Sequence, residues 1–295
     1  MKHRIDPKVD CVFKALLGSA ENRNLLINFL NAVLNQDLCE PIIWVEILNP
    51  YNDKEFIDDK LSVVDVKARD SHDRLYQVEI QMQMYGNLPA RIIYNWADIY
   101  SQQLKSGHDY HKLKATYSIW LMGENVVKTD DHYAHEYKLR DENGQILVEH
   151  GGILLLELNK FNDQDIEDEK QTWLKFFRDG ESLDDKTLPE WMNTKEMRQA
   201  MSTLEKFSEK EQNYHAYQAR LNFLREQRTI LWEYEQNLEL ERQQKLVAIQ
   251  EKEAAMHEKE AAMHEKEAAM HEMRLLSRKR TLPCRKRRLL CKGKS

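Results

Sequence analysis

Two carboxylate residues, Asp65 and Glu79, lie in neighbouring segments in which apolar and polar residues alternate. Alternation with a period of two is typical of half-buried strands, and the turn-forming residues 70–73 between the segments indicate a hairpin. If the two strands pair, Asp65 and the Glu79/Gln81 pair converge on one spot. Carboxylates fixed on strands suit a hard cation that prefers oxygen ligands, such as Mg²⁺ or Mn²⁺. The pattern therefore favours metal-dependent chemistry.

The same alternation predicts which side chains share a face. Val64 and Val66 should lie on one face of the first strand, and Val78 and Ile80 on one face of the second. The polar residues of both strands then point the other way. An alternative is open, because polar residues also occupy the solvated faces of ordinary strands. Asp is disfavoured in strands, and its presence here favours the metal site.

Five short motifs follow one another between residues 10 and 110. They are DCVFK at 10–14, VVD at 63–65, VEIQMQ at 78–83, RIIY at 91–94 and YSQQLKSGHDY at 100–110. Their order and spacing make the segment from Asp6 to about Met122 resemble the Rpn-type family of recombination-promoting nucleases and transposases, within the PD-(D/E)xK nuclease superfamily. The resemblance implies a DNA endonuclease whose cuts promote recombination or transposition.

The resemblance also implies roles for single residues. Asp65 and Glu79 would be metal ligands, with the main-chain carbonyl of Ile80 as a third. The metal would lower the pKa of a bound water and neutralise charge on the scissile phosphate. The superfamily signature has Lys two residues after the Glu, where this chain has Gln81. An uncharged amide can orient a water but does not stabilise an anion as Lys does.

Other residues of these motifs are further candidates. Asp10 would be an additional ligand or a water-positioning group, or alternatively an acid on a helix surface. Arg91 and Tyr94 lie three residues apart on a predicted helix and share a face, so they would contact DNA or simply pack together. Lys14 and Lys67 are also candidates for phosphate contact.

The elements that must position these residues follow from apolar periodicity and turn signals. We predict a helix that starts at Asp6-Pro7 and ends near Leu17, and a second helix capped by Ser19. Strands are expected over 42–48, 61–69, 74–83, 114–122, 132–140 and 152–158, with a helix from Pro89 to before Gly107 and helices after Glu169. This order predicts an α/β fold, a mixed-sheet PD-(D/E)xK-like nuclease core with a long helical C-terminal extension.

The C-terminal extension contains a repeat. We expect a nuclease domain over 1–180, a helical region over 181–250, a repeat helix over 251–273 and a disordered basic tail over 274–295. The heptad EKEAAMH occurs at 251–257 and twice more without change. One large apolar residue per heptad predicts a solvated helix or a weak oligomerising stalk, since a stable coiled coil normally has two.

Charge is distributed unevenly along the chain. The net charge is −6, and residues 274–295 carry ten Lys or Arg and no acid, so the remainder carries about −16. Such a tail is expected to hold nucleic acid through its phosphates, although a cationic end without a function is equally consistent with the composition. The acidic remainder disfavours a large DNA-binding groove but leaves room for a local basic patch.

The sequence disfavours a membrane or secreted protein and a zinc site. No apolar run approaches the roughly 20 residues of a membrane helix, and no secretory signal follows Met1, so we expect a cytoplasmic protein without membrane contact. Cys11, Cys39, Cys284 and Cys291 show no paired spacing, which predicts reduced thiols and no zinc site. The histidines, among them those at 132 and 135, do not form a metal motif and are expected at the surface.

Three functions from different classes follow. The first is a metal-dependent DNA endonuclease that hydrolyses phosphodiester bonds, as a homodimer if it cuts both strands. The second is a nucleic-acid-binding or regulatory relative that lost the chemistry. The third is a scaffold that acts through the helical half, which deletion of residues 208–295 would test. We favour the first, with DNA as the partner.

Overall fold

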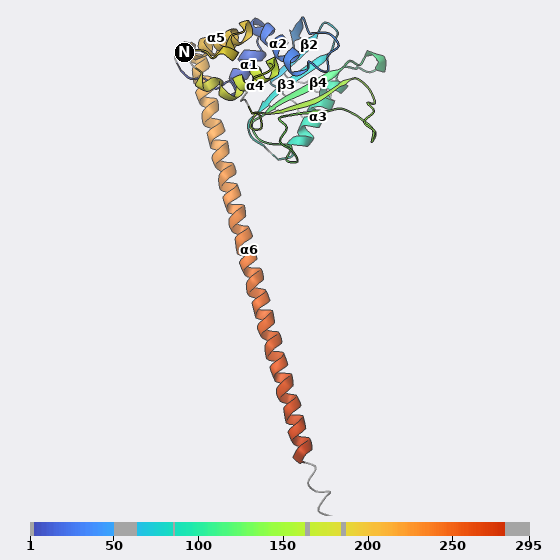
Figure 1. Cartoon of the computed structure of the whole chain (residues 1–295), viewed down its shortest axis with the longest axis vertical. Coiled ribbons are helices and arrows are strands. Elements are labelled where there is room, and N and C mark those ends of the chain that lie inside the picture. Colours follow the sequence, from blue (N-terminus) through green and yellow to red (C-terminus); the bar gives the residue numbers. More distant parts are fainter. Residues whose placement is uncertain (1–2, 50–63, 85, 163–165, 184–186, 281–295) are drawn as a thin grey trace, which may run out of the picture. The chain divides into compact units, whose positions relative to one another are not determined.

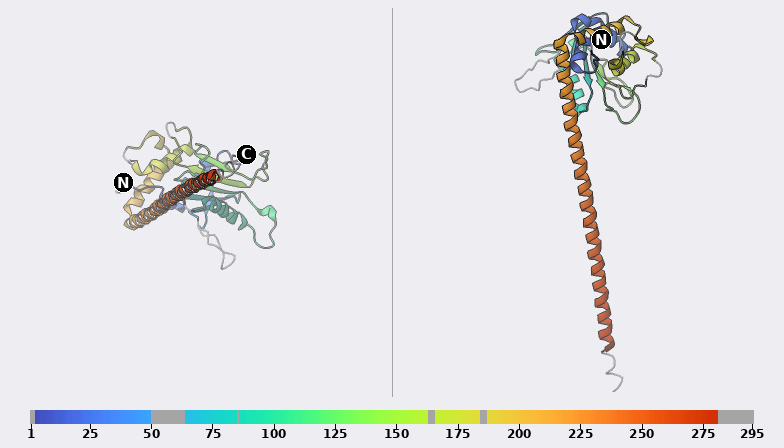
Figure 2. Two further views of the ribbon diagram at one scale, coloured as in Figure 1. Left: turned by 90° about the horizontal axis from the view of Figure 1, so that it is seen from below. Right: turned by 90° about the vertical axis from the view of Figure 1, so that its left-hand side faces the viewer.

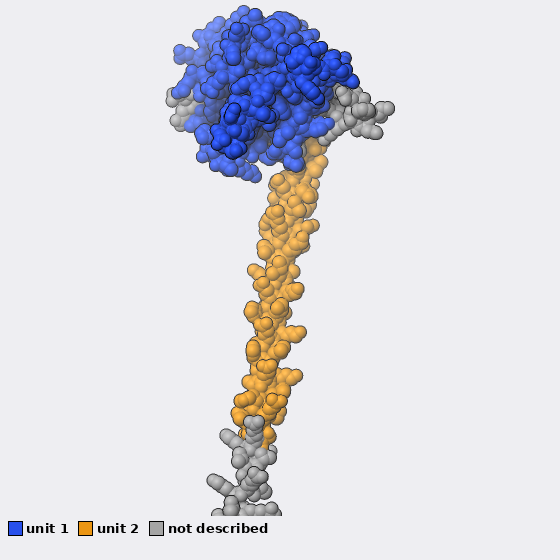
Figure 3. Space-filling model, turned by 90° about the vertical axis from the view of Figure 1, so that its right-hand side faces the viewer, with its two compact units in different colours: residues 1–223 blue, residues 224–295 orange. Residues whose placement is uncertain are grey.

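The computed structural model describes residues 3–49, 64–84, 86–162, 166–183 and 187–280 (Figure 1). Internal contacts divide the chain into two compact units, unit 1 at residues 1–223 and unit 2 at residues 224–295 (Figure 3). Our finer division of the chain into four segments stays a prediction.

Within the described residues, the centre of unit 1 is a mixed six-stranded sheet with the order β1-β2-β3-β4-β6-β5. Strands β3, β4 and β6 are parallel, whereas the β1–β2, β2–β3 and β5–β6 pairs are antiparallel. The predicted α/β mixed-sheet fold is therefore confirmed. The strands are β1 (Val45–Ile47), β2 (Val66–Asp70), β3 (Leu75–Gln81), β4 (Thr116–Met122), β5 (Ala134–Tyr137) and β6 (Gly151–Glu157).

Helices cover both faces of this sheet (Figure 1). One face packs against α1 (Asp10–Leu17), α2 (Arg23–Val33), α4 (Glu169–Asp179) and α5 (Lys195–Glu209), which supply most of the main apolar core. The opposite face packs against α3 (Leu88–Ser101), whose residues join a smaller apolar cluster. Every residue of β4 is buried, as expected for a parallel strand covered on both sides.

The regular alternation that we predicted is interrupted at Asp65. Val78 and Ile80 share the main core with Val66, as predicted. Val64, however, belongs to a separate apolar cluster with Leu75. The expectation that Val64 and Val66 share a face is wrong because Asp65 forms a bend before β2 begins. Residues 61–63 of the predicted strand lie outside the described residues.

The first helix begins later than its sequence signal predicted. Asp6 does not cap it. Its Oδ1 instead accepts a hydrogen bond from the N–H of Lys8 at 2.9 Å in a preceding turn, and Val9 occupies the N-cap of α1. Ser19 does not cap α2 directly, because the N-cap of α2 is Asn22; its side chain instead accepts from the N–H of Glu21 in the short 3₁₀ helix η1 (Ala20–Asn22) that leads into α2.

The first part of α6 (Glu211–Arg280) belongs to unit 1. The ring of Tyr214 stacks on His3 with centroids 3.9 Å apart. Tyr217 is buried, and its hydroxyl oxygen accepts a hydrogen bond from the N–H of Asp6 at 3.0 Å. Residues after 208 therefore contribute to the packing of unit 1.

Unit 2 contains the rest of α6, which continues unbroken through all three heptads (Figure 2). Met256, Met263 and Met270 are 56%, 57% and 48% exposed in the single chain. The solvated helix and the weak oligomerising stalk both stay predictions. None of the described helices combines the length and apolar composition that a bilayer crossing requires. Residues 281–295, which include Cys284 and Cys291, lie outside the described part of the chain.

Candidate active site

Asp65 and Glu79 lie beside each other where β2 begins and β3 approaches its end. Asp65 directly precedes Val66, which pairs with Val78, the residue before Glu79, and the charge of Asp65 acts on the Glu79 carboxyl. Asp65 Oδ2 also accepts a hydrogen bond from the main-chain N–H of Ile80 at 3.1 Å. The hairpin predicted from the sequence thus brings both candidate ligands together.

The environment of Glu79 disfavours its negative charge. The residue is only 6% exposed, and this burial raises the pKa of its carboxyl well above the ordinary value. The nearby charge of Asp65 raises the pKa further, while Gln77 and Arg91 act in the opposite direction. Gln77 Nε2 donates to Glu79 Oε1 at 3.2 Å. Two carboxylates that repel each other in a buried place are the arrangement that a bound cation would stabilise.

A lysine from another element contacts this pair. Lys14 on α1 places its Nζ 3.2 Å from Asp65 Oδ1, and its side chain is 42% exposed. The sequence singled out Lys14 only as a phosphate contact. Its position means that a positive charge stands beside the carboxylates although Gln81 replaces the signature lysine.

Gln81 is held by an arginine from α3. Arg91 Nη2 donates to Gln81 Oε1 at 2.7 Å, and Gln81 Nε2 donates to the main-chain oxygen of Gln83 at 2.6 Å. The Arg91 guanidinium carbon also lies 5.4 Å from the centre of the Trp120 ring. Tyr94, on the same helix, is 46% exposed. The structure therefore brings Arg91 to the site, and Tyr94 stays a prediction.

Asp10 has its own partners away from the carboxylate pair. Its Oδ2 lies 2.9 Å from Arg220 Nε, and its Oδ1 accepts from the N–H of Cys11 at 2.8 Å. These contacts fasten the start of α1 to α6 within unit 1. A role as metal ligand is not supported by any of them and stays a prediction.

The donor atoms near Asp65 suit Mg²⁺ or Mn²⁺. The N–H and the carbonyl of a strand residue point to the same neighbouring strand, so the carbonyl of Ile80 is directed to the side of Asp65. Two carboxylates and a carbonyl form an all-oxygen set, which these cations prefer. Among the described residues no group of three or more His, Cys, Asp or Glu side chains could hold a metal ion.

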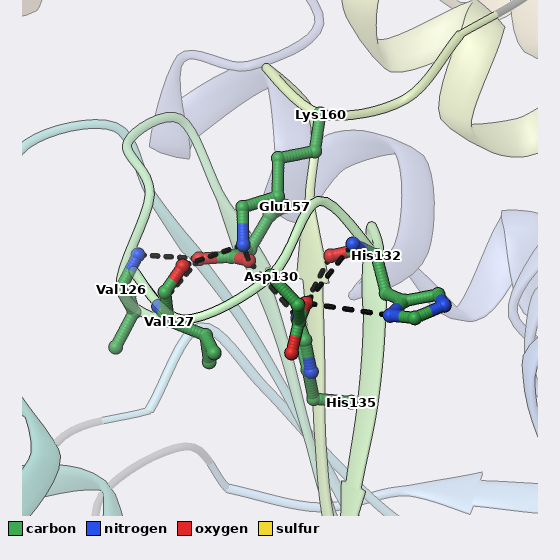
Figure 4. Close-up of polar contacts among 7 residues, drawn as sticks. All are labelled: Val126, Val127, Asp130, His132, His135, Glu157 and Lys160. Carbon is green, nitrogen blue, oxygen red and sulfur yellow. Dashed lines mark hydrogen bonds and ion pairs between the residues drawn. The ribbon is translucent and has the colours of Figure 1, made fainter.

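A second buried carboxylate, Glu157 at the end of β6, was missed by the sequence analysis (Figure 4). Its Oε2 lies 2.7 Å from Lys160 Nζ and 3.2 Å from His135 Nε2. Its Oε1 accepts from the N–H groups of Val126 and Val127. The cluster ties the loop before β5 to the end of β6, which is a structural role. The signal in the sequence was an acid within the apolar run ILLLEL.

The two histidines near this cluster, His132 and His135, differ in how far their side chains are exposed. The His132 side chain is 84% exposed, as expected. The expectation that His135 lies at the surface is wrong, because only 13% of its side chain is exposed. Its ring turns inward, and the same Nε2 lies 3.2 Å from Glu157 Oε2 and 3.7 Å from Asp130 Oδ1 (Figure 4).

A mixed sheet with two carboxylates at the hairpin of its antiparallel part is the arrangement expected of the PD-(D/E)xK class of nucleases. The family described as PD-(D/E)XK nuclease family transposase matches residues 7–234, and the chain belongs to this family. The resemblance drawn from the five motifs is thereby confirmed. No curated protein and no solved structure matches the chain. Family membership supports a function of the nuclease or transposase type, with DNA as substrate.

Proposed function

We propose that the protein is a metal-dependent DNA endonuclease whose active site is built on Asp65 and Glu79, and whose cuts promote recombination or transposition. The observation that carries this proposal is the carboxylate pair at the β2–β3 hairpin, with the Ile80 main chain beside it. We also propose that the protein acts as a homodimer if it cleaves both DNA strands.

In this proposal the chain provides ligands for the metal and polar side chains around it. Asp65, Glu79 and the Ile80 carbonyl would hold Mg²⁺ or Mn²⁺, which supplies a water of lowered pKa and positive charge for the phosphate. Gln81, with its side chain fixed by Arg91 and its own amide bonded to Gln83, would present a rigid polar surface to the substrate.

Lys14 would supply the positive charge that Gln81 lacks. A charged donor aimed at a phosphate oxygen stabilises the negative charge that builds up in the transition state. Lys14 Nζ already lies within 3.2 Å of Asp65 Oδ1, so a phosphate bound at the carboxylates would be within reach of the same side chain. Because the side chain is partly exposed, it is free to turn from the carboxylate to the substrate.

A nucleic-acid-binding or regulatory relative without cleavage activity is the second candidate. It is favoured by Gln81 at the signature lysine position and by the Lys14–Asp65 ion pair, which engages one of the two candidate ligands.

Cleavage of supercoiled plasmid by the purified full chain tests the proposal. We expect nicking in Mg²⁺ or Mn²⁺, none in EDTA, and a loss of about 10³-fold or more in Asp65→Ala and Glu79→Ala. Glu209→Ala, at an exposed carboxylate at the end of α5, is the matched control and should cleave like the wild type. Circular dichroism checks that each variant is folded. Cleavage that survives both substitutions would place the chemistry elsewhere, and no cleavage by the wild type would favour the regulatory relative.

A further inference from the structure

A pocket of about 650 Å³ in unit 1 is strongly cationic. Of the described residues that line it, five are Lys or Arg and one is an acid, Asp73. This concentration of positive charge contrasts with the net charge of about −16 outside the C-terminal tail. The cationic lining residues are Lys67, Arg69, Lys105, Lys112 and Lys114.

The pocket opens on the sheet face that carries Glu79. Arg69 pairs with Leu75 across the hairpin, and Leu75 precedes Glu79 by four residues on β3. Residues separated by an even number of positions point to the same face of a strand. Arg69 and Leu75 both line the pocket, together with Ile99 from α3. The pocket and Glu79 therefore lie on one face, at two levels of β3.

Three of the lining lysines, Lys105, Lys112 and Lys114, come from the segment between α3 and β4. Side-chain hydrogen bonds hold this segment in place. Gln103 Oε1 accepts from the N–H of Lys114 at 2.9 Å, and Gln103 Nε2 donates to the main-chain oxygen of Lys114 at 3.0 Å. The same amide donates to Thr116 Oγ1 at the start of β4, at 2.9 Å. The segment thus has a defined position beside the sheet, while Lys105, Lys112 and Lys114 stay exposed.

We propose that this pocket, through Arg69, Lys105, Lys112 and Lys114, binds the phosphate backbone of duplex DNA next to the carboxylate pair. The inference rests on the proposed nuclease function, since it names where the substrate extends from the candidate active site. Exposed lysines and arginines bind phosphates without reading sequence, and this binding weakens steeply with salt.

The spacing fits a single duplex. Leu75 and Glu79 are four residues apart on β3, which corresponds to about 13 Å at about 3.3 Å per residue. One strand of DNA advances about 3.4 Å along the helix axis per phosphate. A duplex with one phosphate at the carboxylates would therefore bring phosphates about four nucleotides away to the level of the pocket. One DNA molecule would occupy both.

Duplex binding by the full chain in EDTA, where no cleavage occurs, tests the inference. A 20-base-pair duplex is titrated by fluorescence anisotropy at several salt concentrations with wild type, Lys105→Gln/Lys112→Gln/Lys114→Gln, and a control triple variant. The control, Lys195→Gln/Lys206→Gln/Lys210→Gln, removes the same charge from exposed positions on and just after α5, which packs on the opposite face. The basic C-terminal tail is the same in all three proteins, so differences report the substituted lysines.

We expect the pocket variant to bind about tenfold or more weakly and to lower the salt slope of log K by about 3, with the control close to wild type. Equal binding by wild type and pocket variant would overturn the inference, as would an equal loss in the control or a wild type that does not bind duplex DNA. Failure of the nuclease proposal has a different signature, because it appears only in the plasmid cleavage assay. If the pocket variant binds DNA more weakly and the wild type does not cleave DNA, the inference about the pocket holds and the nuclease proposal fails.

Discussion

Lys14 Nζ lies 3.2 Å from Asp65 Oδ1, so an ion pair joins α1 to the bend that precedes β2. The two residues belong to motifs separated by about fifty positions in the chain, DCVFK at 10–14 and VVD at 63–65. Their contact explains in physical terms why both motifs accompany the same site. A helix supplies the positive charge, and the hairpin supplies the carboxylates.

Substitution of Lys14 should affect catalysis much more than folding. We expect Lys14→Ala to lower the rate constant of plasmid cleavage by about 10²-fold, because a charged donor for the phosphate is lost. Lys14→Arg should retain more activity, since it keeps the charge. The free energy of unfolding should change by less than about 1 kcal/mol, because the side chain is 42% exposed. Initial rates and urea unfolding measure the two effects. Wild-type cleavage by Lys14→Ala would exclude this role.

Restoring the signature lysine at position 81 should not raise activity. In Gln81→Lys the new ammonium group would face Arg91, which now donates to Gln81 Oε1 at 2.7 Å. We expect a loss of about 2 kcal/mol in the free energy of unfolding and slower cleavage, because a charge-assisted hydrogen bond is replaced by repulsion. The double variant Gln81→Lys/Arg91→Gln should recover part of the stability. Faster cleavage by Gln81→Lys alone would contradict this account of the site.

Loss of the buried charge at Glu157 should destabilise unit 1. We expect Glu157→Gln to lower the free energy of unfolding by about 3 kcal/mol, since Lys160 would be left buried without a counter-charge. Glu142→Gln, at an exposed position in the loop between β5 and β6, serves as the control and should change it by less than about 0.5 kcal/mol. Chemical denaturation followed by tryptophan fluorescence measures both. Equal stability of the two variants would show that the cluster is not a structural anchor.

Tyr217 should make folding sensitive to alkaline pH. Burial raises the pKa of its phenol to about 12 from the ordinary value of 10.0. The folded protein therefore holds this proton more tightly than the unfolded chain, and the resulting stability is complete below pH 10 and is lost as the pH rises to 12. The stability difference between wild type and Tyr217→Phe should shrink over this range by on the order of 1 kcal/mol. A difference that is constant from pH 9 to 12 would refute the prediction.

The strands and the carboxylate pair could be predicted because their signals are local. Period-two alternation marks each strand, and the turn at 70–73 fixes the antiparallel partner, so the hairpin brings Asp65 close to Glu79 although Asp65 itself lies in a bend before β2. The Lys14–Asp65 and His135–Glu157 contacts could not be predicted in this way. They join elements that are distant in sequence, and no local period reports which side chains such elements bring together.

Local sequence patterns also did not predict where the folded core ends. Deletion of residues 208–295 would remove Tyr214 and Tyr217, which pack within unit 1 against His3 and Asp6. Such a protein would lose core contacts together with the long helix, so inactivity would not identify a scaffold role. A cut after residue 234, where the family match ends, separates the two effects.

The three identical heptads in α6 give the chain a means of changing its length in steps. One heptad adds about 10.5 Å to a helix at 1.5 Å per residue, and it turns the following residues by only about 20°. Gain or loss of a copy through slippage of the repeated coding sequence would therefore lengthen or shorten α6 by this amount while keeping almost the same side chains in line. Copy number of this repeat would change the length of α6 in regular increments, with little change in helical phase.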